Sequence, residues 1–233
     1  MSERLPLILL PGLLCDAALW QHQVRDLADI AETTVADTSV QDSMAAIARS
    51  VLDAAPPRFA LAGLSMGGYV AFEIMRQAPE RVVKLALLDT SPRPDTEEQV
   101  RRRRGLIQLA RMGRFKGVTP RLLPLLIHPD RMEEEGLTGI VYGMAERLGQ
   151  GAFERQQTAI LNRIDSRPTL GAIDCPTLVI VGRQDALTPP DLAQEIADGI
   201  RGAHLHIVED CGHLSPLERP AAVTTAMRTW LLS

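Results

Sequence analysis

The sequence predicts an α/β protein with a doubly wound, mostly parallel sheet of about six strands and a helical insertion. Apolar runs at Leu5–Leu10 and Phe59–Ala62 predict strands that helices cover on both faces, as in a parallel sheet. Strand and helix patterns alternate in residues 1–92 and 166–233, whereas residues 93–165 show helical patterns alone. We therefore expect residues 1–92 and 166–233 to form the core and residues 93–165 to form a lid over the carboxyl ends of the strands.

Each strand of the predicted core is a short apolar run, and each helix has apolar residues three or four positions apart. The expected strands are Leu5–Leu10, Thr33–Ala36, Phe59–Ala62, Val82–Thr90, Leu178–Val181 and His204–Val208. The expected helices run from Leu19 to Ala31, from Ser43 to Pro56, from Gly67 towards Pro79, from Leu192 to Ile200 and from Ala221 to Leu232. Ser43 is the expected N-cap of the second helix, and Pro56-Pro57 stops it.

The insertion is too long and too apolar for a plain loop. Its expected helices are Thr96–Met112, Thr119–Ile127, Met132–Leu148 and Ala152–Ile164. The run Arg101–Arg104 covers all sides of one helical turn, and Glu97 and Glu98 lie one turn earlier. We interpret the run as a solvated helix surface. The alternative is a docking site for an acyl-carrier protein or for the phosphates of coenzyme A.

The composition limits the classes of partner. The formal net charge of −4 argues against general binding to nucleic acid or to an anionic membrane. We expect no membrane span and no signal peptide, because the apolar runs are short and a basic leader is lacking. The chain has three cysteines (Cys15, Cys175 and Cys211), an odd number without metal-ligand spacing, which is typical of reduced thiols in a cytoplasm. We therefore expect a cytoplasmic protein.

The motif G-x-S-x-G stands between a predicted strand and a predicted helix, as Gly63-Leu64-Ser65-Met66-Gly67. A serine on so sharp a turn has a strained backbone, and its hydroxyl stands above the edge of the sheet. Glycine is needed two residues either side of Ser65, because a Cβ there would strike a neighbouring strand or helix. The motif predicts a nucleophilic serine; an N-capping serine at a glycine-rich helix start is the alternative.

A serine hydroxyl needs a base, and a histidine base works best when a carboxylate fixes its tautomer. Asp185 follows the fifth expected strand, and His213 follows the sixth, so all three side chains lie at the same edge of the sheet. Asp89, at the end of the strand Val82–Thr90, is the rival acid, and Asp210 is a weaker candidate. Cys15 lies near the same edge, where we expect a small buried residue.

The three loops GLSMGG, GRQDALTPP and CGHLSPLERP together resemble those of the α/β-hydrolase superfamily, in particular its small carboxylesterases such as pimeloyl-carrier-protein methyl ester esterase. The resemblance covers nearly the whole chain except residues 93–165. It implies that Ser65 attacks an acyl carbon, that His213 moves the proton and that Asp185 orients the histidine. It implies a small ester or thioester as substrate, and we expect neither a cofactor nor a metal ion.

Two features depart from that family. The loop after the first core strand usually reads His-Gly, and here it reads Pro11-Gly12-Leu13. Because the second donor of an oxyanion hole in such a loop is a backbone N–H, we expect Leu13 and Met66 to supply the two donors. The family's leading hairpin is also missing at the start of this sequence, which is why we expect about six strands.

Two other functions remain open at this point. The same three residues could catalyse C–C bond hydrolysis or a lyase step, as elsewhere in the superfamily. A protein of another class, a ligand receptor on a hydrolase scaffold, would bind its ligand without turnover. The three intact catalytic residues favour an enzyme over a receptor.

Overall fold

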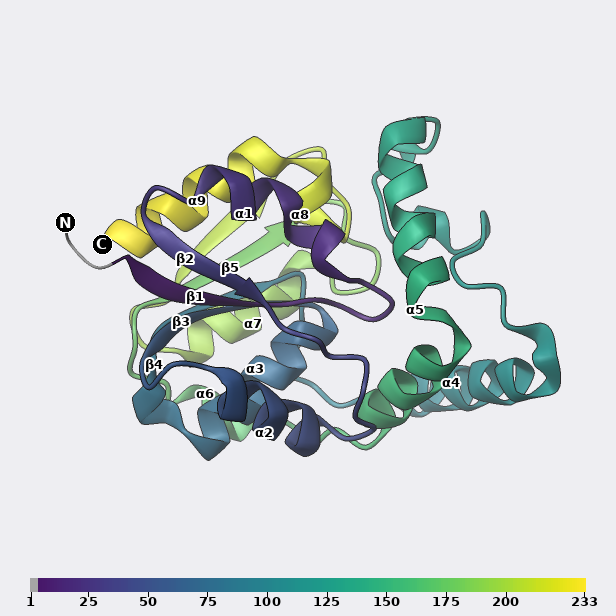
Figure 1. Cartoon of the computed structure of the whole chain (residues 1–233), viewed down its shortest axis with the longest axis horizontal. Coiled ribbons are helices and arrows are strands. Elements are labelled where there is room, and N and C mark those ends of the chain that lie inside the picture. The colour runs from purple at the N-terminus through teal and green to yellow at the C-terminus, as the bar shows by residue number, and fades with distance from the viewer. Residues whose placement is uncertain (1–3) are drawn as a thin grey trace.

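The structure is a computed structural model that describes residues 4–233 (Figure 1). Six parallel strands form one sheet in the order β2-β1-β3-β4-β5-β6. The strands are β1 (Leu5–Leu10), β2 (Ala31–Val35), β3 (Phe59–Leu64), β4 (Val82–Leu88), β5 (Thr177–Gly182) and β6 (His204–Val208). The predicted fold class is therefore confirmed, and the sheet is parallel throughout.

Helices cover both faces of the sheet. The helices of the core are α1 (Gln21–Asp26), α2 (Met44–Ala54), α3 (Met66–Gln77), α6 (Arg167–Leu170), α7 (Pro190–Gly199), α8 (Ser215–Glu218) and α9 (Pro220–Leu232), with 3-10 turns at Ala17–Trp20 and Pro79–Arg81. Helices α2, α3, α6 and α7 pack on one face, and α1 and α9 pack on the other (Figure 1). Successive residues of one strand serve opposite cores: Ile8 and Leu10 face α2 and α3, whereas Leu7 and Leu9 face α1 and α9.

The insertion between β4 and β5 stands at the edge of the sheet where the strands end (Figure 1). It contains α4 (Glu97–Leu109), a π-helical turn at Ala110–Arg114, 3-10 turns at Leu123–Leu125 and Pro129–Arg131, and α5 (Glu135–Leu161). A capping box starts α4, because the Thr96 hydroxyl accepts the Gln99 N–H at 3.2 Å and the Gln99 side chain accepts the Thr96 N–H at 2.8 Å.

One expectation for the insertion needs correction. The helix expected at Thr119–Ile127 is wrong, since only Leu123–Leu125 is helical; Pro120 and Pro124 lack the N–H that a longer helix needs. The two helices expected at Met132–Leu148 and Ala152–Ile164 are both present within α5, which is broken between them at the non-helical Gly149 (φ 71°, ψ −174°). No helix among the described residues is both long and apolar enough to cross a bilayer.

The end of β5 packs against the loop after β6 with no space for a side chain. A Cβ on Gly182 would lie 2.0 Å from the carbonyl oxygen of Gly212 and 2.5 Å from that of Cys211. Both neighbours are backbone atoms, so they cannot turn aside as a side chain could. Gly182 therefore sets the spacing between the loops that follow β5 and β6.

We predict that Gly182→Ala lowers the free energy of unfolding by about 3 kcal/mol, the upper end of the usual cost of overpacking. The matched control is Gly105→Ala in α4, where an added Cβ meets nothing within 4 Å and should raise stability by up to about 1 kcal/mol. Urea denaturation of the two variants measures both changes. Equal midpoints for the two would contradict the packing argument.

Candidate active site

Ser65 occupies a strained turn between β3 and α3. Its φ is 54° and its ψ is −112°, outside the regions that side-chain-bearing residues prefer. The Ser65 N–H donates to the Leu88 carbonyl of β4 at 2.9 Å, and the Thr90 hydroxyl donates to the Ser65 carbonyl at 2.8 Å. The neighbouring strand therefore holds the strained residue from both sides, as the strand–turn–helix pattern predicts.

The glycines of the motif allow this close packing. A Cβ on Gly63 would lie 2.4 Å from the Gly67 carbonyl oxygen, and one on Gly67 would lie 2.2 Å from the carbonyl oxygen of Leu10 in β1. Both clashes involve backbone, which confirms the reason given for glycine at these two positions. Gly68 is equally restricted, because its Cβ would lie 2.4 Å from the Thr90 hydroxyl.

His213 and Asp185 form a buried pair. Nδ1 of His213 lies 2.8 Å from Oδ2 of Asp185, and both side chains are almost fully buried. The loop after β5 fixes the carboxylate, since Oδ1 accepts the N–H groups of Leu187 and Thr188. The Thr188 hydroxyl donates to Oδ2 at 2.7 Å. These bonds from its own loop orient the Asp185 carboxylate towards His213. Because Nδ1 of His213 is bonded to Asp185, Nε2 is the ring nitrogen available for proton transfer.

The pair also sets the charge states of its members. Burial alone would lower the pKa of His213, but the charge of Asp185 and its hydrogen bond outweigh burial and raise that pKa above its ordinary value. Burial alone would raise the pKa of Asp185, but the charge of His213 and the hydrogen bonds from His213 and Thr188 lower it instead. Asp185 is therefore an anion near neutral pH.

The rival acids have other partners. Asp89 is fully buried, its Oδ1 accepts the Gly182 N–H at 2.9 Å, and its Oδ2 accepts the Ser215 hydroxyl at 2.5 Å. Burial and the nearby charge of Asp185 hold the pKa of Asp89 well above the usual range, which favours its neutral form. Asp210 is exposed and faces Arg219. In the described chain, Asp185 is thus the carboxylate bonded to His213.

The loop after β1 lies against the serine turn. A Cβ on Gly12 would come within 3.5 Å of the Ser65 Cβ, so the backbone that carries Leu13 lies beside the Ser65 side chain. Leu14 has a positive φ of 55°, and its N–H donates to the side-chain oxygen of Gln156 in α5 at 3.0 Å. Met66 is the first residue of α3, so its N–H lacks a partner within the helix. The backbone of Leu13 and that of Met66 therefore both lie beside Ser65, and their role as oxyanion donors stays a prediction.

Sequence reasoning missed Gln156 and Glu218. Gln156 bonds to the loop after β1, and Glu218 bonds to the loop that carries His213. Gln156 is fully buried and also donates to the Thr38 carbonyl at 3.3 Å. Glu218 is buried, and its carboxylate accepts the N–H groups of Gly212, Leu214 and His128, the last at 2.7 Å. Burial raises the pKa of Glu218, against the effect of these three bonds. A polar residue within an apolar helical stripe was the available signal for Gln156, and Glu218 had none.

A cavity of about 730 Å³ joins these elements. Ser65 and His213 both line it, together with Gly12, Leu13 and Thr188. The insertion supplies apolar side chains to its wall, namely Leu106, Leu109, Val141, Met144 and Phe153. Cys15 also lines the wall and is buried, as expected, and burial raises the pKa of its thiol to about 12. Such a pocket suits a small apolar or mixed ligand.

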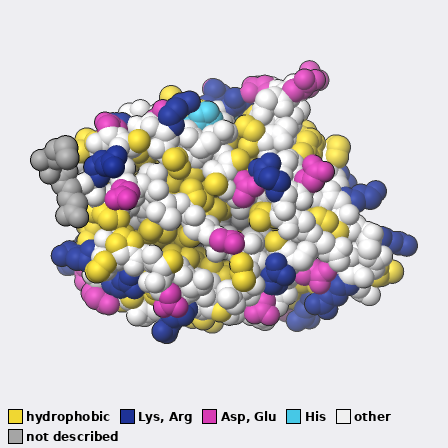
Figure 2. Space-filling view, viewed as in Figure 1, with side chains coloured by type: hydrophobic (Ala, Val, Ile, Leu, Met, Phe, Trp, Pro, Cys, Tyr) yellow, Lys and Arg dark blue, Asp and Glu magenta, His cyan; other side chains and the backbone are white. Residues whose placement is uncertain are grey.

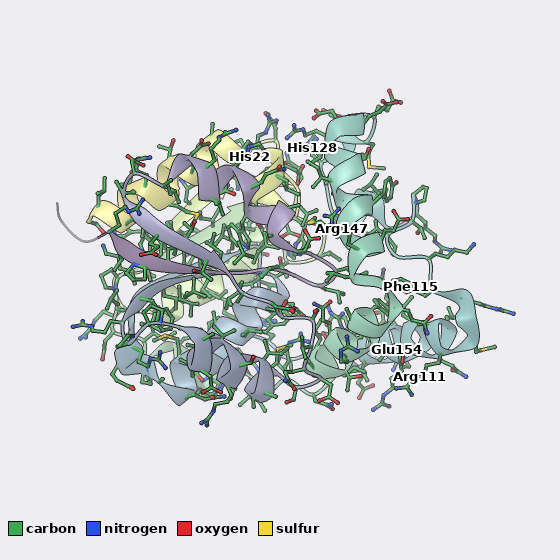
Figure 3. The ribbon with its side chains drawn as sticks, in the orientation of Figure 1. His22, Arg111, Phe115, His128, Arg147 and Glu154 are labelled. Carbon is green, nitrogen blue, oxygen red and sulfur yellow. The ribbon has the colours of Figure 1, made fainter. Side chains whose placement is uncertain are left out.

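Ion pairs join two segments of the insertion to each other and join the insertion to the core. Arg147 of α5 lies 2.7 and 3.1 Å (N···O) from the carboxylate of Asp16, beside the loop after β1. Arg111 of the π-helical turn pairs with Glu154 of α5 at 3.1 Å (Figure 3). The ring centroids of Phe115 and Phe153 lie 5.2 Å apart. The insertion thus contacts the loop after β1 through Gln156 and through Arg147.

The chain resembles known hydrolases over nearly its full length. The family model described as "Alpha/beta hydrolase family" matches residues 7–226. A candidate carbamate hydrolase, RutD, of Variovorax paradoxus (strain S110) is 27% identical over 96% of this chain and 90% of its own. A pimeloyl-[acyl-carrier protein] methyl ester esterase of Vibrio campbellii is 26% identical over 89% of this chain and 87% of its own.

Solved structures agree with the family match. A malate-bound thermophilic esterase from Thermogutta terrifontis superposes with a TM-score of 0.86, at 29% identity, over 98% of this chain and 89% of that one. Fold, sequence and the matched family model therefore lead to one conclusion: the chain belongs to the alpha/beta hydrolase family.

Proposed function

We propose that this hydrolase is a serine esterase that cleaves carboxylic esters or thioesters through an acyl-enzyme, with Ser65, His213 and Asp185 as its catalytic residues. The observation that carries the proposal is the 2.8 Å contact between His213 Nδ1 and Asp185 in the loops that share one cavity with the strained Ser65. The esterases among its relatives support the choice of substrate class.

In the proposed reaction, Ser65 Oγ attacks the acyl carbon while His213 Nε2 takes the hydroxyl proton. The N–H groups of Leu13 and Met66 stabilise the oxyanion. The protonated imidazole, held by Asp185, then gives its proton to the departing alcohol or thiol. A water molecule repeats the sequence on the acyl-enzyme, releasing the acid and restoring the serine.

We predict that a fluorophosphonate probe labels the native protein and fails to label Ser65→Ala, because the probe bonds to an activated serine. Ser91→Ala is the matched control, since Ser91 is also a buried serine in the cavity wall and should leave labelling unchanged. Gel fluorescence measures both. Labelling that survives in Ser65→Ala would reject Ser65 as the nucleophile.

The raised pKa of His213 predicts the pH profile. The base must be neutral, so kcat/KM should fall as the pH drops through a value above 6.5, the ordinary histidine pKa. In Asp185→Asn the carboxylate charge is lost and burial dominates, so this acid limb should move to lower pH. The rate on the plateau should fall by roughly 10³–10⁴.

Initial rates on a p-nitrophenyl ester, measured from about pH 5 to about pH 9, give the position of the acid limb and the rate on the plateau. This interval spans the range in which histidine titrates. The exposed Asp191→Asn, in the first turn of α7, is the control and should keep the native profile. An acid limb that stays in place in Asp185→Asn would show that another group sets it.

Turnover of a diketone instead of the ester would favour C–C hydrolysis.

Gln156 should position the oxyanion loop, since it binds the Leu14 N–H next to the donor residue Leu13. We predict that Gln156→Leu lowers kcat about tenfold, less than the 10²–10³ for losing a donor outright, with little change in KM. Gln150→Leu, which removes a bond to Glu154 on the same helix, is the control. A rise in KM with unchanged kcat in Gln156→Leu would contradict a positioning role.

A further inference from the structure

The cavity wall is strongly cationic, although the chain as a whole is acidic. Seven basic side chains and one carboxylate line the cavity, whereas the chain contains 25 Lys and Arg against 29 Asp and Glu. The basic residues are Arg93, Arg102, Arg103, Arg114, Lys116, Arg121 and Arg163. Lys and Arg side chains are prominent along the right-hand margin of Figure 2, which the insertion forms. A concentration of one charge in a cleft raises the local concentration of ligands of the opposite charge.

Two of these arginines share a single carboxylate beneath the surface. Arg103 Nε donates to Asp95 Oδ2 at 2.6 Å, and Arg163 Nη2 lies 2.7 Å from Asp95 Oδ1, as an ion pair without hydrogen-bond alignment. The exposed side-chain fractions are 21% for Arg103, 7% for Arg163 and 2% for Asp95. The group therefore carries one formal positive charge in excess, largely removed from water, where an unbalanced charge is costly.

The excess charge can be assigned to Arg103. Arg163 is occupied, because it donates to the carbonyl groups of Ile160 and Arg93 in addition to its contact with Asp95. Arg103 uses Nε on Asp95 and Nη1 on Gln157, at 2.8 Å. Its Nη2 has no hydrogen-bond partner among residues 4–233 and belongs to a side chain that lines the cavity. One of the four arginines of the Arg101–Arg104 run is thus not a solvated surface residue.

The cluster lies close to the reactive serine. The Arg163 guanidinium stacks 4.3 Å from the ring centroid of Tyr69, which also lines the cavity. The Tyr69 N–H donates to the Ser65 carbonyl, so Tyr69 lies one helical turn, about 5.4 Å of rise, beyond the serine. Because Ser65 and Arg103 line the same cavity, an acyl chain bound at Ser65 can extend along the apolar wall towards Arg103.

We propose that Arg103 binds a carboxylate at the far end of the acyl group, so that the preferred substrates are monoesters or monothioesters of dicarboxylic acids. This inference rests on the proposed esterase function and deepens it. A carboxylate suits the site because it is a monoanion, matching one excess positive charge, and because the unpartnered Nη2 of Arg103 can donate a charge-assisted hydrogen bond to it. The exposed Arg102, Arg114, Lys116 and Arg121 would attract the anion towards the opening.

The test compares two series of esters. The first contains mono-p-nitrophenyl esters of dicarboxylic acids of about five to eight carbons. The second contains p-nitrophenyl esters of monocarboxylic acids of equal length. At the best length, the native protein should favour the carboxylate-bearing ester by about 10- to 100-fold in kcat/KM, the range for a charge-assisted pair. In Arg103→Met this preference should fall below about threefold, mainly through KM, with little change for the neutral ester. Arg103→Lys should retain part of the preference.

Arg104→Met is the matched control, because Arg104 is the next residue on α4, is exposed and is not part of the cavity wall. Equal losses on both esters in Arg103→Met would reveal a merely structural ion pair and overturn the proposal. A native protein without the preference would also overturn it. So would a preference for coenzyme A thioesters of monocarboxylic acids, in which the anionic groups belong to the leaving group and the acyl group is neutral.

Failure of the esterase function would look different, since neither ester would be hydrolysed. Calorimetric binding of monomethyl glutarate and methyl pentanoate to Ser65→Ala then tests the subsite without turnover. Tighter binding of the glutarate that is lost when Arg103→Met is added supports the carboxylate subsite. Equal binding of the two contradicts it.

Discussion

The whole site depends on the crowding around one strained turn. Ser65 keeps its positive φ because β1, β4 and the start of α3 meet there with no room for side chains at Gly63 and Gly67. A strained backbone persists only where its surroundings over-determine it, and here strand carbonyls and the Thr90 hydroxyl do so. In the proposed reaction, the same crowding fixes where the Ser65 hydroxyl must meet its base and its oxyanion donors.

Close packing and buried polar contacts join the other parts of the site to one another and to the insertion. The Asp185–His213 pair comes from loops that Gly182 holds in close contact, and Glu218 fastens the histidine loop to His128 of the insertion. Gln156 joins α5 to the loop after β1. Glu218 accepts N–H groups from both the insertion and the histidine loop, and Gln156 bonds to the loop after β1. A shift of the insertion would therefore move both of these loops. The buried Asp89 carboxyl group accepts hydrogen bonds from the Gly182 N–H and the Ser215 hydroxyl.

Local sequence patterns predicted the core well and three of the four helices expected in the insertion. The strands and Ser43 at the N-terminus of α2 follow from apolar runs and capping chemistry, which are local signals. The loop positions of Ser65, Asp185 and His213 follow from the topology of a parallel sheet. In the insertion, Pro120 and Pro124 were outweighed by an apolar pattern, and the inward direction of Arg103 depends on Asp95 and Gln157, eight and 54 residues away. Such long-range pairing leaves no periodic trace in the sequence.

In the proposed reaction, Ser65 carries the acyl group during turnover. Rapid acid quenching of the protein during hydrolysis of a slow ester, followed by mass spectrometry of the digested chain, measures this directly. We expect a transient mass increase equal to the acyl group on the peptide that contains Ser65. Turnover without an adduct at that peptide, or an adduct on another residue that forms and decays at the rate of turnover, would contradict it.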